Sequence, residues 1–156
     1  MGLKENLRNE PVSRLALREP VVVRSEATVR EGILQMRERG LGCVIIVDDD
    51  RRPLGIFTEG MLRQMIVGNP AAIEEPLRDH MNRAVRWVRL TDPVAKVLQS
   101  MQFEKTRFVG VIDGAGRLVG LTGQKGLMEY VAEHFPQQVM VQRIGGPPHL
   151  AEREGA

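Results

Sequence analysis

The sequence predicts an α+β fold made of two βαββα repeats, packed through their sheets with pseudo-twofold symmetry. Two observations lead to this prediction. First, the 156-residue chain aligns with itself at an offset of 65 residues without a gap, and such self-similarity indicates a repeated structural unit. Second, each copy alternates helical and strand patterns in the same order. The identical pairs include Val23 and Val88, Met36 and Met101, Val44 and Val109, Asp48 and Asp113, Gly55 and Gly120, and Leu62 and Leu127.

The first copy opens with a short extended segment over 20–23 and continues into a predicted helix. Val29, Ile33 and Met36 follow helical spacing, and this stripe indicates one buried face. Ser25 or Thr28 is a candidate N-cap, and Gly40 is a natural C-terminal stop.

The second copy repeats this pattern from an extended segment over 85–88. Its helix carries an apolar stripe of Val94, Val97, Leu98 and Met101. Thr91 or Asp92 is expected to cap it, with Pro93 in the first turn.

A buried hairpin and a second helix close each copy. The apolar runs 43–47 and 108–112 are typical of strands buried on both faces. Acidic or glycine-containing turns follow, and the return strands are expected over 53–57 and 118–122. The closing helices are expected over about 59–67 and 124–134.

The repeat divides the chain into five parts. We expect an N-terminal arm (1–10), a first repeat (11–67), a linker (68–76), a second repeat (77–135) and a C-terminal extension (136–156). The extension is expected to be largely disordered from about residue 145, because glycine, proline and polar residues dominate there. Neither repeat is large enough to bury its own sheet, so the two are expected to stack.

Composition argues against several classes of function. The net charge is only +2 and the arginines are scattered, so nucleic-acid binding is not expected. Cys43 is the single cysteine and lies in an apolar run, which favours a buried thiol. No apolar run is long enough to cross a bilayer, and residues 1–10 lack a signal-peptide core. We therefore expect a cytoplasmic protein without a membrane segment.

Neither a metal site nor a catalytic site is indicated. The three histidines, His80, His134 and His149, lack metal-ligand spacing. The acidic run 48–50 favours a turn over a calcium loop, since the glycine and closing glutamate of such a loop are missing. No nucleophile and base stand out together.

The repeated pattern resembles the CBS domain. The first copy reads Val44-Ile45-Ile46-Val47-Asp48, then Gly55-Ile56-Phe57-Thr58; the second reads Val109-Gly110-Val111-Ile112-Asp113, then Gly120-Leu121-Thr122-Gly123. This resemblance covers about residues 11–135 and implies a tandem CBS pair, or Bateman module, of the stand-alone bacterial type. It further implies a regulatory homodimer that is not an enzyme and that acts on an unidentified protein. Its clefts would bind an adenosine-type ligand (AMP, ADP, ATP or S-adenosylmethionine), with no other cofactor expected.

The ligand motif of that family is only partly present. The motif reads Gly, two apolar residues, Thr or Ser, two variable residues, and an Asp that accepts hydrogen bonds from the ribose hydroxyls. The first copy keeps Gly55 and Thr58 but has Met61 at the Asp position. The second has Gly123 at the hydroxyl position and Gly126 at the Asp position. A structural or protein-interaction module with degenerate clefts is therefore the alternative.

Two clefts supply the candidate ligand-binding residues. In the first cleft, Thr58 and Glu59 are expected to face Thr106 and Arg107, and Arg107 is the best candidate for an anion contact unless it pairs with Glu104. In the second cleft, an anion could meet the glycine amides and the lysine of a helix start. That cleft would be formed by Gly123, Gln124 and Lys125, with walls from Pro20, Val21 and Leu41.

Two further features fall outside the ligand motif. Trp87, in the opening segment of the second copy, is expected to pack in the core or at a dimer interface. The apolar residues at 139–141 are expected to cover a face or to contact a second subunit.

Overall fold

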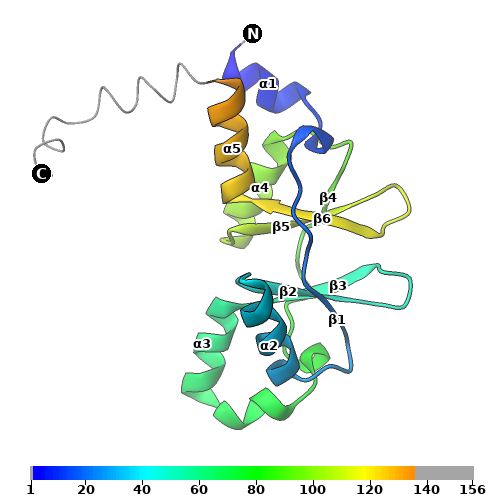
Figure 1. Cartoon of the computed structure of the whole chain (residues 1–156), viewed down its shortest axis with the longest axis vertical. Coiled ribbons are helices and arrows are strands. Elements are labelled where there is room, and N and C mark those ends of the chain that lie inside the picture. Colours follow the sequence, from blue (N-terminus) through cyan, green and yellow to red (C-terminus); the bar gives the residue numbers. More distant parts are fainter. Residues whose placement is uncertain (1, 136–156) are drawn as a thin grey trace, which may run out of the picture.

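The computed structural model describes residues 2–135 and confirms two βαββα repeats (Figure 1). The predicted C-terminal extension and the apolar residues at 139–141 lie outside the described residues. The first repeat comprises β1 (Val22–Arg24), α2 (Val29–Arg39), β2 (Cys43–Val47), β3 (Pro53–Thr58) and α3 (Glu59–Gly68). The second comprises β4 (Val88–Arg89), α4 (Ala95–Glu104), β5 (Phe108–Ile112), β6 (Leu118–Gly123) and α5 (Gln124–His134).

The opening strands are shorter and lie later than the sequence predicts. Half of the expected segment 20–23 precedes β1, which begins at Val22, and all but the last residue of 85–88 precedes β4, which begins at Val88. The expected N-terminal arm contains a helix, α1 (Leu3–Asn9). The expected linker contains a short 3-10 helix, η2 (Pro70–Glu74).

The two sheets have the same topology. In each, the first strand runs parallel to the second, and the second pairs antiparallel with the third. Val23 lies opposite Ile46 in one sheet, and Val88 lies opposite Val111 in the other. The duplication therefore extends to the strand register.

An aspartate shapes the hairpin turn in both copies. Asp48 Oδ1 accepts hydrogen bonds from the amides of Asp50 (2.9 Å) and Arg52 (2.8 Å). Asp113 Oδ1 accepts the equivalent bonds from Ala115 (2.8 Å) and Arg117 (3.0 Å). These bonds to the charged form lower the pKa of Asp113. The acidic run is thus a turn that satisfies its own amides, as the sequence predicts.

The caps of the two opening helices differ. Thr28 and Glu31 form a capping box at the start of α2, and Gly40 ends that helix with a φ of +65°. The expected cap of the second helix is wrong, because Asp92 instead accepts a hydrogen bond from the Arg89 amide at 2.8 Å. Regular helix begins only at Ala95.

The chain crosses between the repeats before the first repeat begins. Pro11 forms a bridge to Pro93, and the amide and carbonyl of Arg18 bond to Leu121 at 2.8 and 2.9 Å. Val12 belongs to the buried core of the second repeat. Figure 1 shows α1 and the following segment beside α5, before the chain descends to β1. Residues 11–18 therefore complete the second repeat.

The segment before the second repeat makes the reciprocal crossing. Thr28 bridges to Pro76, and the Ile56 amide and carbonyl bond to Asn82 at 3.0 and 2.8 Å. Leu77 and Met81 belong to the core of the first repeat. Each repeat is therefore completed by a segment that precedes the other one in sequence.

The sheets face one another across a close-packed centre. A side chain at Gly110 would lie 2.7 Å from the ring of Trp87 and 3.3 Å from Ile45. Trp87 is half-buried against the core of the first repeat, which confirms the expected core packing. Gly110 thus makes room for the indole where the first copy has Ile45.

Candidate functional site

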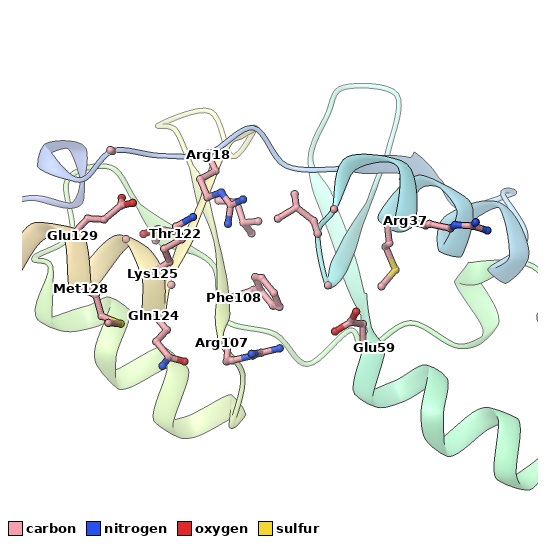
Figure 2. Close-up of a pocket in the computed structure, with 18 of the residues that line it drawn as sticks. Arg18, Arg37, Glu59, Arg107, Phe108, Thr122, Gln124, Lys125, Met128 and Glu129 are labelled. Carbon is pink, nitrogen blue, oxygen red and sulfur yellow. The ribbon is translucent and has the colours of Figure 1, made fainter. Parts of the chain in front are cut away.

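A cavity of about 940 Å³ lies between the two repeats, bounded by α2 of the first and by β6 and α5 of the second (Figure 2). The expected residues Leu41, Gly123, Gln124 and Lys125 all line it. The larger apolar side chains of the lining are Ile33, Met36, Leu62, Phe108, Leu121 and Met128. The other charged ones are Arg18, Arg37, Glu59, Arg107 and Glu129. We call this space the large cleft.

Pro20 and Val21 were expected to wall this cleft, but they do not line it. Both are buried; the Val21 carbonyl accepts a hydrogen bond from the Ile45 amide at 2.9 Å, and its side chain packs in the first repeat's core. Ala16 and Arg18 line the large cleft instead. The reason is the crossing: residue 18 still lies on β6, whereas residue 21 has already joined the other sheet.

A smaller cavity of about 270 Å³, the small cleft, brings together Thr58, Glu59, Thr106 and Arg107, as the sequence predicts. The two hydroxyls also serve the backbone. Thr58 Oγ1 accepts from the Met61 amide at 3.3 Å and caps α3, and Thr106 Oγ1 accepts from the Phe108 amide at 3.2 Å. Its other polar lining is Arg63, Asn82, Glu104 and Lys105.

Arg107 is exposed, and no carboxylate among residues 2–135 forms an ion pair with it. The pairing with Glu104 that the sequence left open does not occur, because that carboxylate accepts a hydrogen bond from the Arg86 amide at 3.2 Å. The Arg107 guanidinium lies 5.8 Å from the centre of the Phe108 ring. Its positive charge is therefore available to an anion.

The structure explains why glycine occupies two positions of the second ligand motif. Gly123 has a φ of +154°, and any side chain there would overlap the carbonyl of Arg107. A side chain at Gly126 would lie 2.5 Å from Thr122 Oγ1. The backbone at 123 thus excludes a hydroxyl side chain, and Thr122 occupies the space that a carboxylate at 126 would need.

Thr122 is a cleft residue that sequence reasoning missed. It is 4% exposed, and its Oγ1 has no hydrogen-bond partner within the described part of the chain. A buried hydroxyl without a partner costs stability. Nothing in the repeat marks this position, since the equivalent residue in the first copy is the buried Phe57.

Replacing Thr122 by valine is expected to raise the free energy of unfolding by about 1 kcal/mol. The buried hydroxyl gives up its hydrogen bonds to water when the protein folds, whereas a methyl group has none to give up. Urea denaturation followed by circular dichroism measures this change. A destabilised variant would show that the hydroxyl has a partner, such as an ordered water molecule.

Arg18 is another missed cleft residue, and the sequence did carry a signal for it. The 65-residue offset also pairs Pro11 with Pro76 and Arg18 with Arg83. Extending the repeat upstream to these pairs would have marked 11–18 and 76–83 as equivalent segments of the fold.

Comparison with known families gives two matches to this chain. The CBS domain family matches residues 12–68 and again residues 77–133. Each range contains the five strands and helices of one repeat, except for the last residue of α5, together with the preceding segment that packs against the other repeat.

Solved structures of CBS proteins have the same fold. The CBS domain protein PAE2072 from Pyrobaculum aerophilum, complexed with AMP, superposes with a TM-score of 0.66 at 25% identity, over 76% of this chain and 96% of that one. The CBS domain pair of protein MJ0100, in complex with 5′-methylthioadenosine and S-adenosyl-L-methionine, gives a TM-score of 0.69 at 20% identity, over 79% and 96%.

The curated relatives are distant in sequence, and the match covers a different fraction of the length of each one. An uncharacterized protein of Acidianus ambivalens is 27% identical over 74% of this chain and 70% of its own length. An uncharacterized protein of Methanopyrus kandleri is 27% identical over 79% and 63%. The arabinose 5-phosphate isomerase GutQ of Escherichia coli matches over only 29% of its own length, so the rest of that enzyme has no counterpart in the match.

Within residues 2–135, no group of three or more histidine, cysteine or acidic side chains is placed to hold a metal ion. No helix in this range is both long enough and apolar enough to cross a membrane. Cys43 is buried, and burial raises the pKa of its thiol to about 12, so this thiol is not poised to react.

Proposed function

The chain belongs to the CBS domain family and contains two CBS domains, and on that basis we propose that it is a regulatory module that binds an adenosine-type ligand between its repeats. The ligand would be AMP, ADP, ATP or S-adenosylmethionine. Binding would bias the conformation of a regulated protein and thus couple two sites. The module itself would carry no catalytic activity and would act in the cytoplasm.

The large cleft is the observation that carries this proposal. Its volume of about 940 Å³ is ample for a nucleotide. Apolar walls such as Phe108 and Leu121 suit a purine, and Lys125 and Arg107 suit phosphate or carboxylate. Two proteins of the same fold are solved with adenosine compounds.

A module without a ligand is the second candidate, and the ligand motif favours it. Met61 and Gly126 stand where a carboxylate would bind ribose, and each lost charged hydrogen bond costs about 1.5–3 kcal/mol of affinity. In this case the clefts have lost their ligand, and the module serves only as a structural or protein-interaction domain.

Thermal unfolding separates the two candidates. AMP, ADP, ATP, S-adenosylmethionine and NAD are added separately at millimolar concentration, with a short nucleic acid as the control. A ligand at 100 times its dissociation constant is expected to stabilise the protein by about 2.7 kcal/mol. An unchanged melting temperature with all of them would refute ligand sensing as stated and support the second candidate.

Replacing Arg107 by alanine is expected to remove at least nine-tenths of the affinity for any phosphate-bearing ligand, because a charge-assisted hydrogen bond is lost. Arg89→Ala is the matched control, since that exposed arginine on β4 lines neither cleft. Isothermal titration measures both variants. Equal affinity in both would show that Arg107 does not contact the ligand.

We also propose that the module forms a homodimer. Apolar side chains are exposed on the closing helices: Ile66 (52%) and Val67 (88%) on α3, and Met128 (63%) on α5. Exposed apolar groups of this kind favour a protein interface. Sedimentation velocity is expected to give twice the chain mass, and a monomer at micromolar concentration would overturn this assignment.

A further inference from the structure

We propose that the two clefts compete for a single guanidinium, that of Arg107, so that each chain binds one anionic ligand strongly and a second one at least tenfold more weakly. This inference rests on the proposed function and adds a regulatory property to it. The ligand class is an organic anion with a phosphate or carboxylate group.

The two clefts share one wall. Gly42, Glu59, Arg107 and Phe108 each line both the large and the small cleft. Figure 2 shows the side chains of Arg107 and Glu59 pointing toward one another across the boundary between the repeats. A ligand in either cleft therefore meets the same pair of charges.

The duplication supplies an arginine to this shared wall from the second repeat only. The 65-residue offset pairs Arg107 with Gly42, so the position that gives one repeat a guanidinium gives the other no side chain. Both positions have the same backbone role: the Gly42 carbonyl accepts from the Glu59 amide (3.1 Å), and the Arg107 carbonyl accepts from the Gln124 amide (3.2 Å). The backbone of Arg107 is thus fixed while its exposed side chain is free to serve either cleft.

The two shared charges set the sign of the coupling between the clefts. An anion in one cleft draws the guanidinium toward itself and leaves Glu59 facing the other cleft without that nearby positive charge. The second anion then meets this carboxylate without the Arg107 guanidinium beside it, and both effects weaken its binding. The coupling is therefore negative.

Other cations limit the size of the effect. Arg18, Arg37 and Lys125 line only the large cleft, and Arg63 and Lys105 line only the small one. Each cleft keeps some attraction for an anion, so the second site is weakened rather than abolished. The loss of one charge-assisted hydrogen bond corresponds to about tenfold or more in affinity.

Isothermal titration of the full chain with ATP tests this proposal. We expect a stoichiometry of one per chain, with any second event at least tenfold weaker. Two equal and independent molecules per chain would overturn the coupling but leave the proposed function standing. If ATP, AMP and S-adenosylmethionine give no heat of binding and no thermal stabilisation, that result would overturn both the coupling and the proposed function.

Two variants distinguish a shared guanidinium from other causes of a single strong site. Gly42→Arg adds a second guanidinium to the wall that both clefts share, so two ligands no longer compete for one, and a second ATP is expected to bind within about threefold of the first. The double variant Gly42→Arg/Arg107→Gly is the control, because it returns to one guanidinium and should return to one strong site. A single strong site in Gly42→Arg, with native melting behaviour, would contradict the proposal.

Glu59→Gln provides a second test that does not depend on the larger replacement. Removing the carboxylate is expected to reduce the difference between the two dissociation constants by at least threefold. The amide keeps the size of the side chain and its position at the start of α3. An unchanged difference would show that Glu59 plays no part in the coupling.

Discussion

Replacing Gly123 by serine is expected to destabilise the protein by about 3 kcal/mol or more, although it would restore the hydroxyl of the family's ligand motif. The φ of +154° is strained for any L side chain, and the new Cβ would overlap the Arg107 carbonyl. The β5–β6 pair would have to open, because Gly123 lies opposite Phe108. Urea denaturation followed by circular dichroism measures the loss.

Gly68→Ala is the matched control for this replacement. Gly68 ends α3 with nothing within 4 Å of an added Cβ, and its φ is not in the positive range. We expect its free energy of unfolding to change by less than about 1 kcal/mol. A Gly123→Ser protein as stable as this control would show that the backbone at 123 relaxes, and the motif position would then be free to carry a hydroxyl.

Replacing Leu77 by alanine is expected to lower the free energy of unfolding by about 2–5 kcal/mol. Leu77 lies after the closing helix of the first repeat, in the segment that leads to β4, yet its side chain is fully buried in the core of the first repeat. An added Cβ at Gly32 of α2 would lie 2.8 Å from Leu77 Cδ1, so this helix is fitted closely around it. Removing the side chain leaves a cavity beneath α2.

The control for this second replacement is Leu34→Ala, also on α2. Leu34 is 53% exposed, so its replacement should cost less than about 1 kcal/mol. Guanidinium denaturation measures both variants. Equal small losses would contradict the crossing of the chain between repeats, since Leu77 would then contribute nothing to the first core.

The duplication made most of the fold predictable. Equal spacing placed the hairpins and closing helices, because apolar runs and turn residues recur together at the same offset. The aspartate turns followed from local chemistry alone, since each carboxylate bonds amides two and four residues later. The residues of the small cleft followed from the same symmetry, which brings Thr58 toward Arg107.

The remaining features depend on tertiary packing that the repeat does not encode. Pro20 and Val21 were misplaced because the chain crosses between sheets just before them. The glycine at 123 resembled a lost ligand residue, whereas its backbone angle and the nearby carbonyl explain it. The hydroxyl of Thr122, which has no hydrogen-bond partner among residues 2–135, is buried by packing that the repeat does not encode.

Amide chemical shifts during a titration with ATP report on ligand binding between the repeats. We expect saturable shifts at Leu41, Gly123, Gln124 and Lys125 of the large cleft and at Arg107 of the shared wall, with the exposed end of α3 at Val67 unchanged. Shifts confined to the outer helix faces, or no shifts at millimolar ATP, AMP and S-adenosylmethionine, would contradict it.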